Sequence, residues 1–148
     1  MKTLELTALQ ELLPHRYPFL LVDRIEVVEP GRHVIGFKRI TAGEWWMEGV
    51  RPGVRPVPTM PHMLVLEALA QTSGALVRDL LTGTASARAY FMGATHVRLR
   101  APAPAGHELT LDVSLLKWGR GICRARGVAT VGGRTVVSAE LTTVVRPG

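Results

Sequence analysis

The chain has 148 residues, with 18 Lys or Arg against 12 Asp or Glu, so its formal net charge is +6. This length favours one domain, expected to span residues 1–148, and a core that needs no disulfide staples. Cys123 is the only cysteine, which excludes an intrachain disulfide and favours a reducing compartment.

Several classes of protein are excluded by the same totals. No apolar run approaches the roughly 18 residues of a membrane span, and the first residues lack the apolar core of a signal peptide. We therefore predict a cytoplasmic protein without a membrane segment. The positive charge suits an acidic partner, but no basic run carries interleaved aromatic residues, so we do not expect nucleic acid.

The first part of the chain predicts a short helix, two strands and an irregular loop. Leucines recur along Thr3–Leu13, which predicts a helix that Pro14 ends. Leu20–Val28 and Arg32–Ile40 are predicted strands with a Pro-Gly turn between them. Thr41–Thr59 is rich in glycine and proline, so we expect it to be irregular.

A long apolar helix is predicted over Pro61–Leu81. Its apolar residues cover every face rather than one stripe, which indicates a helix buried on most sides. At 1.5 Å per residue it is about 30 Å long and crosses a small domain. Glu67 and Gln71 are four residues apart and therefore share one helix face. A carboxylate in such apolar surroundings needs a partner or a changed pKa, unless it reaches solvent.

The second half of the chain changes to a period of two, which is typical of strands. Thr82–Ser86 is expected to connect it to the helix, and Gly132-Gly133 suits a hairpin turn. The predicted strands are Ala87–Arg98 with a bend at Gly93, Leu109–Leu115, Cys123–Ala129 with its small side chains facing the helix, and Arg134–Val145.

These elements predict an α+β protein. Consecutive hairpins imply an antiparallel sheet of about six strands, with the long helix on one of its faces. One helix cannot cover such a sheet completely, so we expect the chain to pair with a second copy.

Two motifs resemble one family. His15-Arg16-Tyr17-Pro18-Phe19-Leu20-Leu21-Val22-Asp23-Arg24-Ile25 is similar to the signature near the start of bacterial 3-hydroxyacyl-acyl carrier protein dehydratases. Met60-Pro61, followed by Leu64 and Glu67-Ala68-Leu69-Ala70-Gln71, is similar to the central helix of that family. The resemblance covers nearly the whole chain.

The resemblance implies a hot-dog fold, in which a curved antiparallel sheet wraps a long helix, and a dimer whose sheets join edge to edge. Family sites lie at the dimer interface and combine a histidine of one subunit with a helix acid of the other. The substrate is an acyl thioester on the phosphopantetheine arm of acyl carrier protein. The histidine takes a proton from C2, and the acid protonates the hydroxyl that leaves C3.

Glu67 occupies the acidic position, but the histidine position differs. The family reads Gly-His-Phe-Pro-Gly before the helix, whereas this chain reads Gly49-Val50-Arg51-Pro52-Gly53, and the loop that follows is longer. Val50 cannot act as a base. His62, at the start of the helix, is the candidate replacement, and the competing interpretation is that it fills space or caps the turn.

The remaining site residues follow from the same resemblance. No spacing typical of metal ligands occurs, so we predict no metal and no cofactor beyond the pantetheine-borne substrate. The other histidines are expected to pack (His15) or to be solvated (His33, His96 and His107). The predicted substrate-binding residues are Gln71, Met60, Pro61, Leu64, Trp45, Trp46, Val50 and Gly53.

Three functions remain open. The chain is a dehydratase with a relocated base, or an acyl-binding partner subunit that gives Glu67 to a histidine-bearing paralogue in a heterodimer, or a hot-dog thioesterase in which Glu67 activates water. In each case we expect a homo-oligomer or hetero-oligomer. Arg98, Arg100, Arg124 and Arg126 are candidates for contact with an acidic acyl carrier protein.

Overall fold

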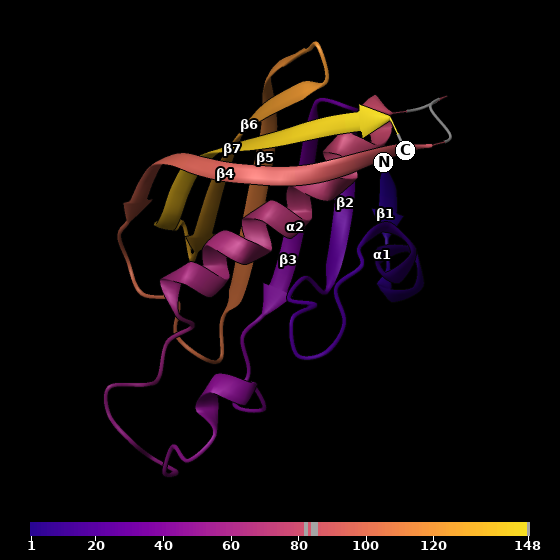
Figure 1. The fold of residues 1–148 in the computed structure, drawn as a ribbon. Helices are drawn as coiled ribbons and strands as arrows, with labels where there is room; N and C mark the ends of the chain where they lie inside the picture. Colours follow the sequence, from indigo (N-terminus) through magenta and orange to yellow (C-terminus); the bar gives the residue numbers. More distant parts are fainter. Residues whose placement is uncertain (82, 84–85, 148) are drawn as a thin grey trace.

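The computed structural model describes residues 1–81, 83 and 86–147, so most of the predicted connection Thr82–Ser86 lies outside the described residues. Seven strands and one long helix form the main part of the fold (Figure 1). In chain order the elements are β1 (Lys2–Leu4), α1 (Leu6–Leu12), β2 (Arg24–Glu29), β3 (His33–Arg39), a 3-10 turn (Trp45–Met47), α2 (His62–Leu80), β4 (Ala87–Leu99), β5 (Glu108–Gly119), β6 (Ile122–Val131) and β7 (Arg134–Pro147).

The strands form one seven-stranded sheet in the order β1-β2-β3-β5-β6-β7-β4. Every neighbouring pair is antiparallel. Helix α2 enters the chain between β3 and β4 and lies across one face of the curved sheet (Figure 1). This arrangement confirms the predicted α+β architecture of a long helix enclosed by antiparallel strands.

Close contact between α2 and the sheet depends on small residues in the strands. A Cβ atom at Gly36 of β3 would collide with the side chain of Thr72, so glycine lets this strand approach the helix. In β6, Gly127 lies against Leu69, as the predicted small strand face requires. Cys123, on the same strand face, is buried, and burial raises the pKa of its thiol to about 11.

The N-terminal elements differ from the prediction in two places. The predicted helix Thr3–Leu13 begins only at Leu6, because residues 2–4 form a seventh strand, β1, on the edge of β2. The strand predicted to begin at Leu20 begins at Arg24. The backbone N–H of Leu21 bonds to the side chain of Gln71 instead of to a neighbouring strand.

Strand β4 forms one edge of the sheet and is irregular. Its register with β7 shifts between Phe91 and Gly93, which agrees with the predicted bend. A second shift lies between Thr95 and Arg98, where His96 has a φ of 52°. Left-handed backbone is uncommon outside glycine, so β4 has two irregularities along its length.

Candidate functional site

Glu67 lies on α2 at the wall of a cleft of about 560 Å³, hereafter the Glu67 cleft. Its side chain is 32% exposed. Among the described residues that line the cleft, Glu67 is the only carboxylate and Arg78 is the only Arg or Lys. Apolar side chains fill much of the remaining wall, from Leu12, Leu13, Val77, Leu81 and Phe91.

Gln71 connects Glu67 to the segment 15–21. Its Nε2 donates to Oε1 of Glu67 at 3.0 Å and to the carbonyl of Phe19 at 2.6 Å. Its Oε1 accepts the backbone N–H of Leu21 at 3.0 Å. Gln71 is 2% exposed, and a buried amide is stable there because these bonds satisfy it. The predicted helix pair of Glu67 and Gln71 therefore lies together on one face, and both residues line the cleft.

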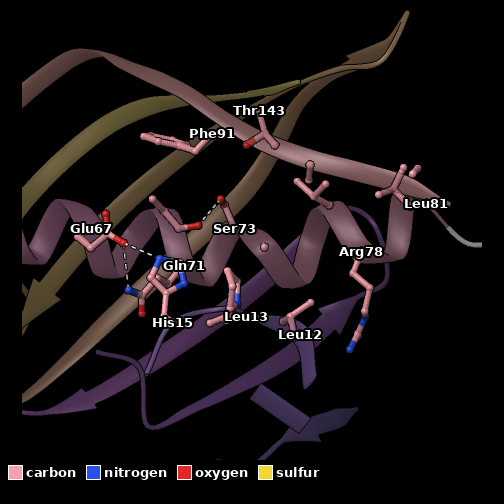
Figure 2. A pocket seen from close by; sticks show the side chains of 16 residues that line it. Leu12, Leu13, His15, Glu67, Gln71, Ser73, Arg78, Leu81, Phe91 and Thr143 are labelled. Carbon is pink, nitrogen blue, oxygen red and sulfur yellow. Dashed lines mark hydrogen bonds and ion pairs between the residues drawn. The ribbon is translucent and has the colours of Figure 1, made fainter. Parts of the chain in front are cut away.

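His15 also reaches Glu67. Its Nε2 lies 3.1 Å from Oε1 of Glu67, and the two side chains point toward one another in Figure 2. The sequence had suggested that His15 packs, so its contact with the carboxylate corrects that interpretation. The spacing of the two residues in the sequence carries no signal for this contact, because it joins segments that only the fold brings together.

His62 is half-buried at the start of α2. Its Nε2 lies 3.0 Å from the carbonyl oxygen of Ala101. It precedes Glu67 by five positions, which is a rotation of about 140° around the helix axis. The structure therefore does not bring His62 and Glu67 to one face of α2, and His62 as a base stays a prediction that requires a second chain.

The other predicted substrate-binding residues lie away from the Glu67 cleft within this chain. Met60 is buried in the core, and Leu64 is half-buried beside it. Pro61 is exposed just before α2, and Val50 and Gly53 are exposed on the loop. Of the predicted set, the cleft of a single chain contains only Gln71.

Trp45 and Trp46 lie in the 3-10 turn, next to the signature segment. The ring of Trp45 is 6.1 Å from that of Phe19, and the two tryptophan rings meet edge to face at 6.0 Å. A nearly buried ion pair holds this turn to β3, with Nζ of Lys38 at 2.8 Å from Oε1 of Glu44. Trp45 therefore lies against Phe19, and Trp46 lies against Trp45.

A second cleft, of about 660 Å³, lies over β4, β6 and β7 and is named the arginine cleft. Arg98, Arg100, Arg126 and Arg134 line it. Its one carboxylate, Glu140, is already bonded to Arg124 at 2.8 Å, and this guanidinium lowers the pKa of the Glu140 carboxyl. Three of the four predicted docking arginines, Arg98, Arg100 and Arg126, thus line one positively charged hollow.

Neither a metal centre nor a membrane span is found in the described part of the chain. Residues 1–81, 83 and 86–147 contain no group of three or more His, Cys, Asp or Glu side chains placed to hold a metal ion. Among these residues, no helix has the length and apolar character to cross a membrane.

Known sequences are similar to this chain over most of its length. Residues 13–140 match the model of the FabA-like domain. The 3-hydroxyacyl-[acyl-carrier-protein] dehydratase FabZ of Syntrophotalea carbinolica is 42% identical over 145 residues, covering 98% of this chain and 97% of that protein. FabZ of Bacillus subtilis is 40% identical and covers 94% of this chain and 96% of that protein.

Solved structures share the fold at low sequence identity. The dehydratase heterocomplex ApeI:P from Xenorhabdus doucetiae matches with a TM-score of 0.72 and 20% identity, covering 95% of this chain and 91% of that one. A hypothetical thioesterase with coenzyme A from Streptococcus pneumoniae matches with a TM-score of 0.62 and 16% identity, covering 83% and 86%. These matches confirm the predicted hot-dog fold.

Proposed function

The chain belongs to the FabA-like family of 3-hydroxyacyl-acyl carrier protein dehydratases, and we propose that Glu67 transfers a proton to a 3-hydroxyacyl thioester bound in the Glu67 cleft. One observation carries this proposal: the cleft's only described carboxylate is the residue at the family's acidic position. The apolar wall suits an acyl chain, and the reacting end of the substrate would lie beside Glu67.

The proposed step breaks the C2–H bond and the C3–O bond. Glu67 gives its proton to the leaving hydroxyl group, water departs, and the electrons of the C2–H bond form the C2=C3 double bond. A base must accept the proton of C2. Val50, at the family's histidine position, has no group that accepts one, so a homo-oligomer of this chain is a weak dehydratase.

Assembly with a second chain is part of the proposal. Strand β4 is an edge strand of 13 residues, and the side chains of Tyr90, Phe91 and Met92 on it are exposed. A long apolar edge favours pairing with another strand. Pairing through β4 would join two sheets, and the Glu67 cleft includes Phe91 of this strand, so a second chain would lie beside the site.

A heteromeric dehydratase is the second candidate. Val50 leaves the site without the family's base, whereas the setting of Glu67 is intact. We propose that such a chain gives Glu67 to a partner whose loop carries the histidine. The thioesterase alternative has only a shared fold in its favour.

The arginine cleft is the proposed contact for the carrier of the substrate. Acyl carrier proteins are acidic, and four guanidinium groups in one hollow attract carboxylates. We expect binding of an acyl carrier protein to weaken between low and moderate salt, because screening shortens the reach of these charges. Binding that does not change with salt would contradict the contact.

The test is turnover of a 3-hydroxyacyl thioester by the purified chain, with and without a histidine-bearing hot-dog chain. Glu67→Gln should lower dehydration by about 10²–10⁴-fold, since it removes the acid. Glu11→Gln, which changes an exposed glutamate on α1, is the matched control and should leave the rate unchanged.

Three outcomes separate the candidates. Weak activity of the chain alone that a histidine-bearing partner raises, and that Glu67→Gln abolishes, supports the heteromeric dehydratase. Release of free thiol that depends on Glu67 supports the thioesterase instead. Dehydration at a normal rate that Glu67→Gln does not change would overturn the role of Glu67.

A further inference from the structure

We propose that His15 is a positioning residue for Glu67: it holds one oxygen of the carboxyl group and leaves the other available to the substrate. The inference rests on the proposed role of Glu67 in proton transfer. It concerns a residue that precedes α2 by almost fifty positions and that the family's proton-transfer pair does not include.

Two side-chain nitrogens lie close to the same oxygen of Glu67. Nε2 of His15 is 3.1 Å from Oε1 in an ion-pair contact, and Nε2 of Gln71 donates a hydrogen bond to the same atom at 3.0 Å. Figure 2 shows both His15 and Gln71 joined to Glu67 by dashed lines. A carboxyl group held at one oxygen by two neighbours has lost most of its freedom to rotate, and its second oxygen, Oε2, keeps one direction.

The ring of His15 is suited to position Glu67, the proposed proton donor, and not to act as the missing base. In the proposed contact, Nε2 carries a proton and directs it at the Glu67 carboxyl group. Nδ1 is buried and has no hydrogen-bond partner among the described residues. One nitrogen is therefore occupied and the other is inaccessible to a substrate, so neither can accept the proton of C2.

The backbone on both sides of His15 is fixed. Arg16 donates to the carbonyls of Leu13 at 2.9 Å and Gln10 at 3.1 Å, which ties the segment to the end of α1. On the other side, Gln71 binds the backbone of Phe19 and Leu21. The imidazole is thus set before any ligand binds, as a positioning group must be.

The experiment compares a side chain without a donor with one that restores it. His15→Leu removes the N–H, and His15→Gln places an amide N–H at a similar reach. We expect His15→Leu to lower kcat by about 10²-fold, since displacement of a catalytic group by about 1 Å has that effect. KM should change little, and His15→Gln should recover most of kcat.

A matched histidine–carboxylate pair supplies the control. Nε2 of His33 is 3.0 Å from Oδ2 of Asp112, on strands β3 and β5 and outside the lining of the Glu67 cleft. His33→Leu and His33→Gln should leave both kcat and KM unchanged. His15→Asn, which is polar but too short to reach Glu67, repeats the loss of the donor if His15→Leu does not fold.

A second measurement does not depend on activity. In protein labelled with ¹³C at the glutamate carboxyl carbons, Glu67→Gln identifies the Glu67 resonance by its disappearance. At one fixed pH, this resonance should move in His15→Leu and His15→Asn, return toward its original shift in His15→Gln, and stay unmoved in the His33 variants. The contact is therefore tested even if the chain alone turns over no substrate.

Two results would overturn the proposal. The first is a Glu67 resonance that does not move in His15→Leu and His15→Asn. The second is an equal loss of kcat in His15→Leu and His15→Gln, which would indicate a merely structural role. Failure of the proposed function looks different, because Glu67→Gln would then have no effect on turnover, whatever the His15 variants do.

Discussion

The signature segment, residues 15–21, and the loop at residues 48–56 are two neighbours of α2 that are held in very different ways. The signature segment is bonded to a buried side chain of α2, and the ring of its Phe19 stacks near Trp45. Residues 48–56 are all exposed, and their described backbone bonds are local, from Val50 to Met47 at 3.0 Å and from Val54 to Arg51 at 3.3 Å.

The two regions correspond to the two groups that the family's reaction uses, an acid and a base. The firmly held segment supports the acid, Glu67, through Gln71 and His15. The loosely held loop is where the family places its base, and here it carries Val50. A proton-transfer group needs a fixed position as well as the right chemistry, and of these two regions only the signature segment holds a side chain that can carry a proton, that of Glu67.

The largest expected effect comes from releasing the firmly held segment. Gln71→Leu leaves the N–H of Leu21 and the carbonyl of Phe19 without their bonds, at about 1–3 kcal/mol each, so stability should fall by about 2–6 kcal/mol. Urea unfolding measures this loss. Gln10→Leu, on the exposed side of α1, is the control and should cost much less. Equal stabilities of the two variants would contradict the comparison.

Restoring the base to the loop should have a smaller effect. Val50→His should raise dehydration by about tenfold, or about 1.4 kcal/mol in the barrier, because the loop does not fix the new ring. A well-placed base gives about 10²–10⁴-fold. The gain should vanish when Glu67→Gln is added, and Val54→His, on the same loop, should give none. A gain of 10⁴-fold would show that the loop holds position 50 as firmly as the segment holds Glu67.

The smallest effect is expected at an exposed loop residue. Arg51→Ala should change the free energy of unfolding by less than about 0.5 kcal/mol, because Arg51 is exposed and its side chain fills no core. Thermal unfolding of the two proteins side by side measures the difference. A loss above about 1 kcal/mol would reveal packing of the loop and weaken the contrast with the signature segment.

Much of the fold could be predicted because its signals are local. The apolar run after Pro61 predicts α2, and the period of two after Ala87 predicts the last four strands. Strand β1 was missed because three residues are too few to show a period. The start of β2 was misplaced because Leu20 and Leu21 look like a strand, while the hydrogen bond that keeps Leu21 out of the sheet comes from Gln71.

The site was predicted only in part, for the same reason. Glu67 and Gln71 are four residues apart, and helix geometry alone places them together. His15 contacts Glu67 across fifty-two positions of sequence, and nothing in the spacing of residues reports such a contact. His62 was favoured because it is close in sequence, although helix rotation turns it to another face.

The long helix, the antiparallel pairing and the shared helix face of Glu67 and Gln71 follow from the sequence alone. These depend on residue type and on repeats that a few neighbouring residues define. Tertiary structure alone decided which histidine meets Glu67, which walls form the Glu67 cleft and which arginines share a hollow. Side-chain contacts between distant segments depend on how the segments pack, and packing brings residues together regardless of their separation along the chain.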